Sequence, residues 1–216
     1  MKKLVFTLLA LVAINYTYSQ EKTEEVKADE EEMQTLFKGI ESNGGYGSLV
    51  VRYSQLDGKD GVQVGGRAGW IINHNFVIGM GGSGVIGMAY VKDYSGEKKN
   101  VRNNLGYGGL LFEKVFFPKK AIHFSVPVLI GAGGLAVTPD YNYDDNNQDD
   151  WDENDIEASA FFVVEPGIEM EMNLFKFMRF NIGAYYRATS KVSIDGMSSG
   201  AANGFSVGAT IKFGIF

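Results

Sequence analysis

His123 and Ser125 are the residues of this 216-residue chain whose types and spacing come closest to a catalytic pair. A general base must lie within hydrogen-bonding distance of its nucleophile, and residues two apart on a strand share a face. However, His123 begins a predicted strand directly after the turn 117–120. The sequence shows no Ser, His and Asp constellation and no metal-ligand spacing around it. We therefore expect a protein that is not an enzyme and that has no cofactor and no metal.

A glycine-rich motif at 79–84 reads Gly-Met-Gly-Gly-Ser-Gly and matches the dinucleotide-binding fingerprint. That fingerprint needs a helix that starts at the glycines and presents its amides to a pyrophosphate. The following residues, 85–88, continue a strand pattern instead. We therefore interpret these glycines as positions where neighbouring strands pack and bend.

An acidic stretch, 140–157, carries nine carboxylates. Calcium takes six to eight oxygen ligands, and an EF-hand loop needs glycine at its sixth position, which no register supplies here. A solvated, flexible loop is the favoured interpretation. The alternative is loose divalent-cation binding by Asp144, Asp145, Asp149, Asp150 and Asp152.

The first 19 residues predict a secretory signal peptide. Lys2 and Lys3 precede an apolar core at 4–14, and Thr17 and Ser19 allow cleavage before Gln20. The core is shorter than the ~18 residues that a membrane anchor usually needs. No cysteine follows it, so a lipid anchor is excluded.

Residues 20–44 form a predicted periplasmic segment, in which 21–41 hold eight acids and three lysines. Its few apolar residues fall on one helical stripe, which indicates a solvated extension with a short helix or an arm that binds a partner. Without Lys2 and Lys3 the chain has 18 basic and 26 acidic residues, a net charge of −8. That balance argues against nucleic acid, whose phosphates attract clustered Lys and Arg.

Eight later stretches alternate apolar with small or polar residues, as half-buried strands do. They span 46–56, 62–72, 76–90, 105–116, 122–137, 158–174, 179–188 and 205–216. The connections after the second, fourth and sixth are brief, while those after the third, fifth and seventh are long. This sorting is typical of a membrane barrel with periplasmic turns and extracellular loops. The sequence thus predicts an all-β fold over 45–216, an eight-stranded antiparallel up-and-down transmembrane β-barrel.

A secreted sandwich would show the same alternation, because side-chain period does not say which face is wet. The stretches are ~11 to 16 residues long, whereas strands of soluble proteins typically have 5 to 6. Aromatic residues gather near the strand ends, where interfacial girdles belong. These are Trp70, Phe76, Phe116, Phe117, Phe175, Phe177, Phe213 and Phe216. We therefore favour the membrane barrel.

In strand pattern, strand count and terminal Phe216, residues 46–216 resemble small eight-stranded outer-membrane barrels of the OmpX and OmpA-transmembrane type. The resemblance implies the outer membrane of a Gram-negative cell, contact with lipid and lipopolysaccharide, and assembly through the C-terminal strand by the barrel-assembly machinery. We also expect a monomer. One departure from the family pattern concerns the last strand, where apolar residues are expected in phase with the terminal aromatic residue. The residues in phase with Phe216 are instead Lys212 and Gly214, and the apolar residues in the opposite phase are Ile211, Phe213 and Ile215.

The spacing of His123 and Ser125 also resembles outer-membrane lipid A deacylases of the PagL type. Those enzymes work at the outer leaflet, whereas His123 adjoins a turn predicted to be periplasmic. A lipid A-modifying enzyme is thus the weaker alternative.

Charges on the predicted inner face suggest that the lumen is packed. An eight-stranded interior is just wide enough for side chains to fill it, and buried charges must be paired. The inward charges are Arg52, Arg67, Arg179, Arg187 and Lys212 against Glu113, Glu165, Glu169 and Glu171. We expect the arginines at 67, 179 and 187 to pair with the glutamates at 165, 169 and 171, and the inward charges of the adjacent sixth and seventh strands to face each other at cross-strand distance.

The resulting hypothesis is a non-enzymatic outer-membrane barrel with a closed, charge-filled lumen and a structural or cell-surface interaction role. A narrow pore for small solutes is the main alternative. Pro127 and Pro166 lie inside predicted strands, and we expect each to mark a β-bulge.

Overall fold

The computed structural model describes residues 42–94, 97–139 and 157–216. The predicted signal peptide and the acidic segment up to residue 41 lie outside these ranges. The candidate cation loop also lies outside them, with Asp144, Asp145, Asp149, Asp150 and Asp152. Within the described ranges, no helix is both long and apolar enough to cross a membrane.

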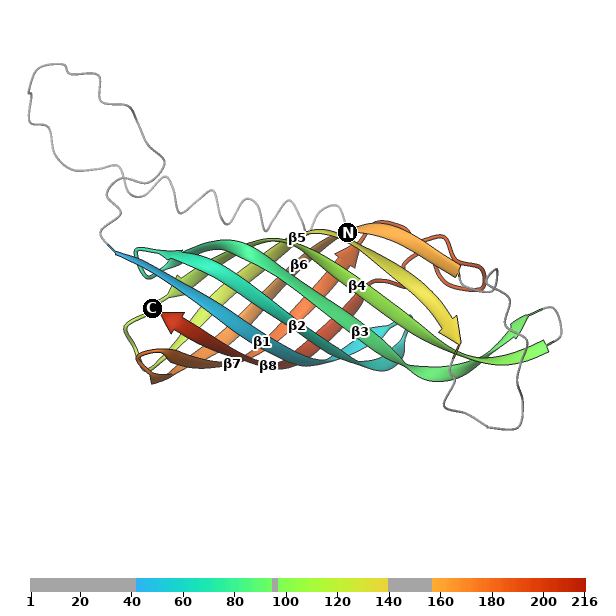
Figure 1. The fold of residues 1–216 in the computed structure, drawn as a ribbon, viewed down its shortest axis with the longest axis horizontal. Coiled ribbons are helices and arrows are strands. Elements are labelled where there is room, and N and C mark those ends of the chain that lie inside the picture. Colours follow the sequence, from blue (N-terminus) through green and yellow to red (C-terminus); the bar gives the residue numbers. More distant parts are fainter. Residues whose placement is uncertain (1–41, 95–96, 140–156) are drawn as a thin grey trace, which may run out of the picture. The chain divides into compact units, whose positions relative to one another are not determined.

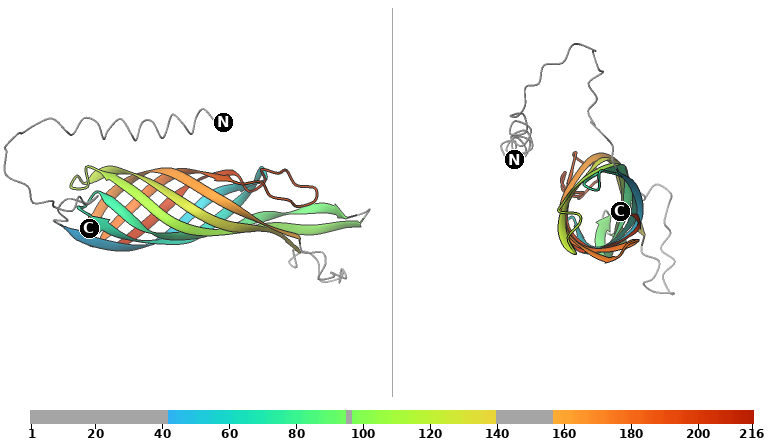
Figure 2. Two further views of the ribbon diagram at one scale, coloured as in Figure 1. Left: turned by 90° about the horizontal axis from the view of Figure 1, so that it is seen from above. Right: turned by 90° about the vertical axis from the view of Figure 1, so that its left-hand side faces the viewer.

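Eight antiparallel strands close into one barrel, in which each strand pairs with its neighbours in sequence and β8 pairs with β1. Figures 1 and 2 show the closed wall from the side and from one end. The strands are β1 Asn43–Leu56, β2 Lys59–Ile72, β3 Phe76–Tyr94, β4 Glu97–Phe116, β5 Ile122–Pro139, β6 Glu157–Phe175, β7 Met178–Thr189 and β8 Gly204–Ile215. The predicted fold class is confirmed.

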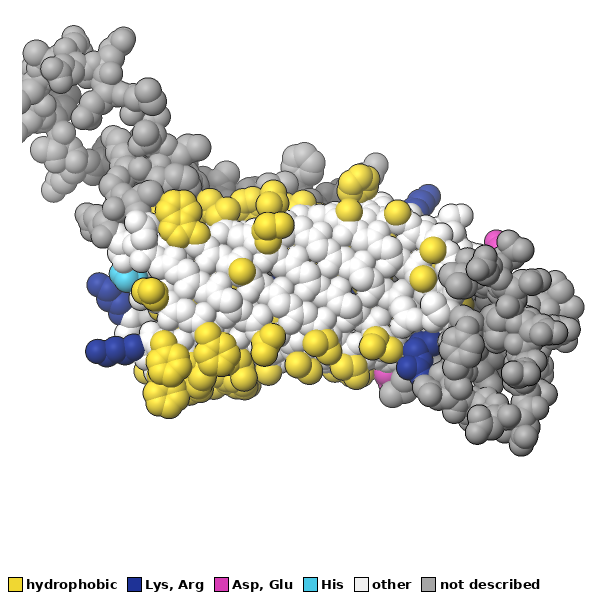
Figure 3. Space-filling model, in the orientation of Figure 1, with side chains coloured by type: hydrophobic (Ala, Val, Ile, Leu, Met, Phe, Trp, Pro, Cys, Tyr) yellow, Lys and Arg dark blue, Asp and Glu magenta, His cyan; other side chains and the backbone are white. Residues whose placement is uncertain are grey.

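Side-chain alternation gives the barrel wall two unlike faces. Large apolar side chains project outward, with Phe162 76% and Ile215 74% exposed. Figure 3 shows hydrophobic side chains along the visible wall, with charges only near its two ends. Arginine, lysine and glutamate are buried inside instead. This polarity is the reverse of a water-soluble protein and suits a wall surrounded by lipid.

The two ends of the barrel are different, and we name them for their connections. The turn end carries the short β2–β3, β4–β5 and β6–β7 turns, the start of β1 and Phe216. The loop end carries the other four connections. Among them, Asp57 and Gly58 alone join β1 to β2, both at positive φ (51° and 72°), as a tight two-residue hairpin turn requires.

The β3–β4 hairpin is longer than the sequence pattern indicates, because most of the connection expected between the strands 76–90 and 105–116 is itself strand. Its ladder continues through Val91–Asn100 and Tyr94–Glu97, after a bulge between Ile86 and Ala89. The two strands extend past the rest of the wall at the loop end (Figure 2). Beyond the lipid an antiparallel pair needs no apolar face, so hydropathy alternation does not mark where it ends.

The bulges expected at Pro127 and Pro166 are not found. The β5–β6 register is the same at Ser125–Glu169 and at Val128–Pro166, although the two pairs between them are missing. Each proline still pairs on one side, Pro127 with Glu113 and Pro166 with Val128. Proline lacks a backbone N–H, so each of these residues loses a hydrogen bond to one neighbouring strand. No extra residue is inserted, and the register is therefore unchanged.

Candidate functional site

Lys212 of β8 lies at the centre of the buried charges in the half of the lumen nearer the turn end. Its ammonium is 2.6 Å from a carboxylate oxygen of Glu113 and 3.5 Å from one of Glu169, and it also bonds Glu171. All four side chains are about 1% exposed or less. One cation therefore binds three carboxylates that would otherwise repel one another.

The same three glutamates offer oxygens within 4.8 Å of one another, a spacing that could hold a metal ion. Lys212 already supplies the positive charge between them. The donor set is therefore explained by an ammonium, and we assign no metal to it.

Glu169 of β6 is held by several donors in addition to Lys212. Its carboxylate accepts from Arg67 Nη1 at 2.5 Å, from the Tyr185 hydroxyl at 2.5 Å and from Asn181 Nδ2 at 2.6 Å. A buried carboxylate is tolerated when its charge is paired and its lone pairs are filled, and both conditions hold here.

A second group lies nearer the loop end. Arg52 Nη1 of β1 donates to Glu165 at 2.9 Å, and the Tyr107 hydroxyl donates to the other oxygen of the same carboxylate. Gln63 Nε2 donates to Tyr107 at 2.8 Å. The Arg52 guanidinium also lies 3.3 Å from the centroid of the Tyr185 ring, so Tyr185 connects this group to Glu169.

The predicted partners of Arg187 are wrong, while those of Arg67 and Arg179 include the expected glutamates. Arg179 Nη1 lies 3.4 Å from Glu171. Arg187 donates to the carbonyls of Ala202 at 2.7 Å and Gln55 at 3.0 Å, not to a glutamate. It therefore fastens the β7–β8 loop to β1 rather than completing the ion network.

The expectation that inward charges of β6 and β7 meet across adjacent strands holds for Arg179 with Glu171, but the other main ion pairs cross the lumen. In the β6–β7 ladder, Glu169 faces Gly183 and Glu171 faces Asn181. The arginine that binds Glu169 comes from β2, half-way round the barrel, as Lys212 of β8 lies half-way round from Glu113 of β4. Inward side chains are long enough to meet across the narrow interior, so the ion pairs brace opposite walls.

An apolar cluster lies at the turn end of the lumen. It consists of Tyr46, Ile71, Val77 and Val115, with Phe216 packed against it. Phe216 stacks on Tyr46 at 6.4 Å between ring centroids, and the Arg179 guanidinium lies 4.0 Å from its ring. Its expected place in the outer aromatic girdle is therefore wrong. The inward phase that it shares with Lys212 and Gly214 explains the difference.

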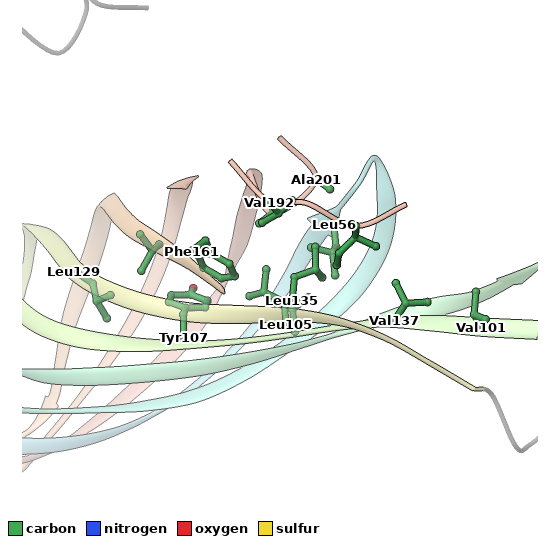
Figure 4. Close-up of a cluster of buried hydrophobic side chains, with 14 residues drawn as sticks. Leu56, Val101, Leu105, Tyr107, Leu129, Leu135, Val137, Phe161, Val192 and Ala201 are labelled. Atoms are coloured by element: carbon green, nitrogen blue, oxygen red, sulfur yellow. The ribbon is translucent and has the colours of Figure 1, made fainter. Parts of the chain in front are cut away.

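A larger apolar cluster lies at the loop end. Residues of β1, β3, β4, β5 and β6 meet Val192, Ile194, Ala201 and Ala202 of the β7–β8 loop, which folds into the barrel mouth. Figure 4 shows Val192 and Ala201 above Leu56, Leu105 and Leu135. The loop is also held by hydrogen bonds, such as that from the Asp57 amide to the Ala201 carbonyl at 3.0 Å.

His123 and Ser125 do not form a base–nucleophile pair. Both are buried inside the barrel, and each bonds Glu171, His123 through Nε2 at 3.0 Å and Ser125 through Oγ at 2.9 Å. They act here as polar partners of a buried carboxylate.

Sequence reasoning missed the uncharged partners of the network, chiefly Tyr46, Tyr107, Tyr185, Gln63 and Asn181. Strand phase could have identified these residues, because each lies in the same inward-facing phase of its strand as the charged residues. Tyr46, for example, donates to Glu113 at 2.8 Å.

Comparison with known proteins supports the fold alone. No protein-family model and no curated protein matches the chain. The solved structure of Neisserial surface protein A is similar over 82% of this chain and 99% of its own, with 11% identity and a TM-score of 0.56. Weaker matches are Ail of Yersinia pestis (13% identity, 81% and 100% covered, TM-score 0.40) and OprG of Pseudomonas aeruginosa (13%, 79% and 93%, 0.42).

The closed barrel, its lipid-facing exterior and its buried charges together identify an integral outer-membrane β-barrel. In lipid every backbone polar group must be bonded within the protein, which a closed barrel achieves without an edge. Eight antiparallel strands with short turns at one end fit that class.

Proposed function

We propose that this barrel is a non-enzymatic outer-membrane protein with a closed lumen, and that its role is structural or lies in contacts at the cell surface. The observation that carries the proposal is the filling of the lumen at three successive levels. These are the Tyr46–Phe216 cluster, the charges around Lys212 and Glu169, and the apolar cluster beneath the β7–β8 loop. Conductance through the purified barrel tests it.

A narrow pore is the alternative, and the two apolar clusters argue against it. Ions would have to pass Phe216 at one end and the Val192 and Ala201 contacts at the other, where few polar groups could replace their water. Between these ends, Arg67–Glu169 and Lys212–Glu113 cross the lumen.

The surface role draws support from the β3–β4 hairpin. Its strands have 19 and 20 residues, whereas a tilted span needs ~9–11. The excess length projects beyond the membrane on the side where outer-membrane barrels carry their extracellular loops. A surface partner would meet this hairpin first.

Catalysis on lipid A has little support. His123 and Ser125 are buried, bind Glu171 and lie near the turn end, so a lipid in the outer leaflet could not reach them.

Assembly as a monomer through β8 remains part of the proposal. The outward residues Ile211, Phe213 and Ile215 form the apolar stripe that the barrel-assembly machinery would meet. Lipid and lipopolysaccharide would then surround the wall.

A further inference from the structure

A cavity of about 760 Å³ opens among the three short turns at the turn end of the barrel. Its walls come from the β2–β3 turn (His74), the β4–β5 turn (Pro118, Lys119), the β6–β7 turn (173–176), and Arg179 with Phe216. A volume of this size is in the range of small-molecule sites.

The charged side chains that line this cavity are all basic. Lys119, Lys176 and Arg179 line it, and no acidic side chain of the described residues does. Arg179 is only 5% exposed, and its Nε is buried without a hydrogen-bond partner although one Nη bonds Glu171. A buried guanidinium with an unused donor is suited to an oxyanion, which it can bind through two parallel N–H groups.

The cavity walls are held in place before any ligand arrives. Asn173 Nδ2 donates to the carbonyls of Pro118 at 3.3 Å and Lys120 at 2.8 Å, which ties the β4–β5 and β6–β7 turns together. The Gly214 amide donates to the Phe177 carbonyl at 2.9 Å, which ties β8 to the same turn. A preorganised site loses less conformational entropy on binding.

The cavity also borders the lipid. Leu174 and Phe175 line it and are exposed apolar side chains (49% and 60%), and Phe175 stacks on Phe177 at 5.7 Å. Exposed aromatics of this kind mark the membrane–water interface. A molecule bound here can place an anionic group beside Arg179 and apolar chains along Leu174 and Phe175.

We propose that this cavity binds the phosphate group of a phospholipid headgroup from the periplasmic leaflet. Short turns of outer-membrane barrels face the periplasm, and basic pockets at a membrane surface recognise lipid phosphates. Lys119, Lys176 and Arg179 bind the phosphate, while Leu174 and Phe175 contact the acyl chains. The site is independent of whether the lumen conducts.

The test is native mass spectrometry of the full-length folded barrel in a neutral detergent, titrated with dioleoylphosphatidylglycerol. Wild type should bind one lipid tightly. The double variant Lys119→Gln/Lys176→Gln should lose about thirtyfold in affinity, as expected when two lysines each contribute about 1 kcal/mol. Both lysines are exposed, so folding should be preserved, and retained heat-modifiable migration on gels checks this.

The matched control is Lys114→Gln/Lys120→Gln, which removes the same charge from the same end but outside the cavity, and should change the affinity by less than about threefold. Equal losses in the two double variants, or none in either, would overturn the site. Dioleoylglycerol, which lacks phosphate, should not compete with dioleoylphosphatidylglycerol for the site. If it competed equally well, the phosphate would not be recognised and the site would be only an apolar groove. Glycerol phosphate binding as tightly as the lipid would overturn the lipid assignment in favour of a soluble phosphate ester.

Discussion

Lys212 on β8 and Glu113 on β4 lie half-way round the barrel from each other, and their charged groups meet at 2.6 Å inside it. Each is buried, and each has further partners, Glu169 and Glu171 for the lysine and Tyr46 for the glutamate. The pair braces opposite walls of the sheet, so the lumen charges should contribute to stability as a connected unit.

Replacing Lys212 with Met should destabilise the barrel by ~3–5 kcal/mol, because three buried carboxylates would lose their shared cation. Urea unfolding in lipid vesicles measures the change. Lys191→Met, at an exposed loop position, is the control and should shift the free energy of unfolding by no more than ~0.5 kcal/mol. Indistinguishable stabilities for the two variants would show that Lys212 does not hold the network.

Replacing Glu169 with Ala should likewise cost ~3–5 kcal/mol, because Arg67 would be left buried without a carboxylate. Asp149→Ala, in the acidic loop outside the described residues, should change stability very little. A double-mutant cycle with Arg67→Ala should give a coupling energy of ~0.5–3 kcal/mol. Strict additivity of the two changes would mean that the pair across the lumen does not form.

Gly131 on β5 should not tolerate Ala, because a Cβ there would lie 2.0 Å from the Gly108 carbonyl oxygen and 2.6 Å from Gly109 Cα. These are backbone atoms of β4, so relief would require the strands to separate. Gly106→Ala, on the same strand pair but with nothing within 4 Å, is the control. Refolding yield should fall for the first variant only, and equal yields would contradict the close approach.

Val192→Asp should release the β7–β8 loop from the barrel mouth, because it buries a carboxylate in an apolar cluster. Hydrogen exchange of residues 190–203 should then become faster. Ser193→Asp adds the same charge at the next, exposed position and should leave exchange nearly unchanged. Protection that survives in the Val192 variant would show that the loop is not held by apolar packing.

Ser125→Ala should leave the lipid A of expressing cells unchanged in mass, because Ser125 is fully buried and bonds Glu171. Mass spectrometry of extracted lipid A, compared between cells with wild type, the variant and no barrel, checks this. An acylation pattern that depends on Ser125 would establish the enzyme that we disfavour.

Most of the fold could be predicted from the sequence, because alternation and connection length are local signals. The strand from 122 to 137 predicted for β5, for instance, differs from the observed Ile122–Pro139 by two residues. The β3–β4 hairpin was underestimated because its outer part leaves the lipid, where alternation of hydropathy is no longer required.

The inward charges could also be predicted, but not their partners. Phase along a strand says that Arg187 points inward, yet it cannot say that the β7–β8 loop brings the Ala202 carbonyl within 2.7 Å of it. Contacts such as Arg67 with Glu169 depend on the register of strands far apart in sequence. Phe216 was expected in the aromatic girdle, although the phase that it shares with the inward Lys212 indicates the position inside the barrel where it stacks on Tyr46.

Planar-bilayer recording from the purified, folded wild-type barrel tests the closed lumen most directly. Two apolar clusters and the charges between them fill the interior, so we predict no steady conductance above that of the bare bilayer, at low or high salt. A steady, large conductance that rises with salt concentration would mean that the lumen is an aqueous channel, and it would contradict the closed barrel.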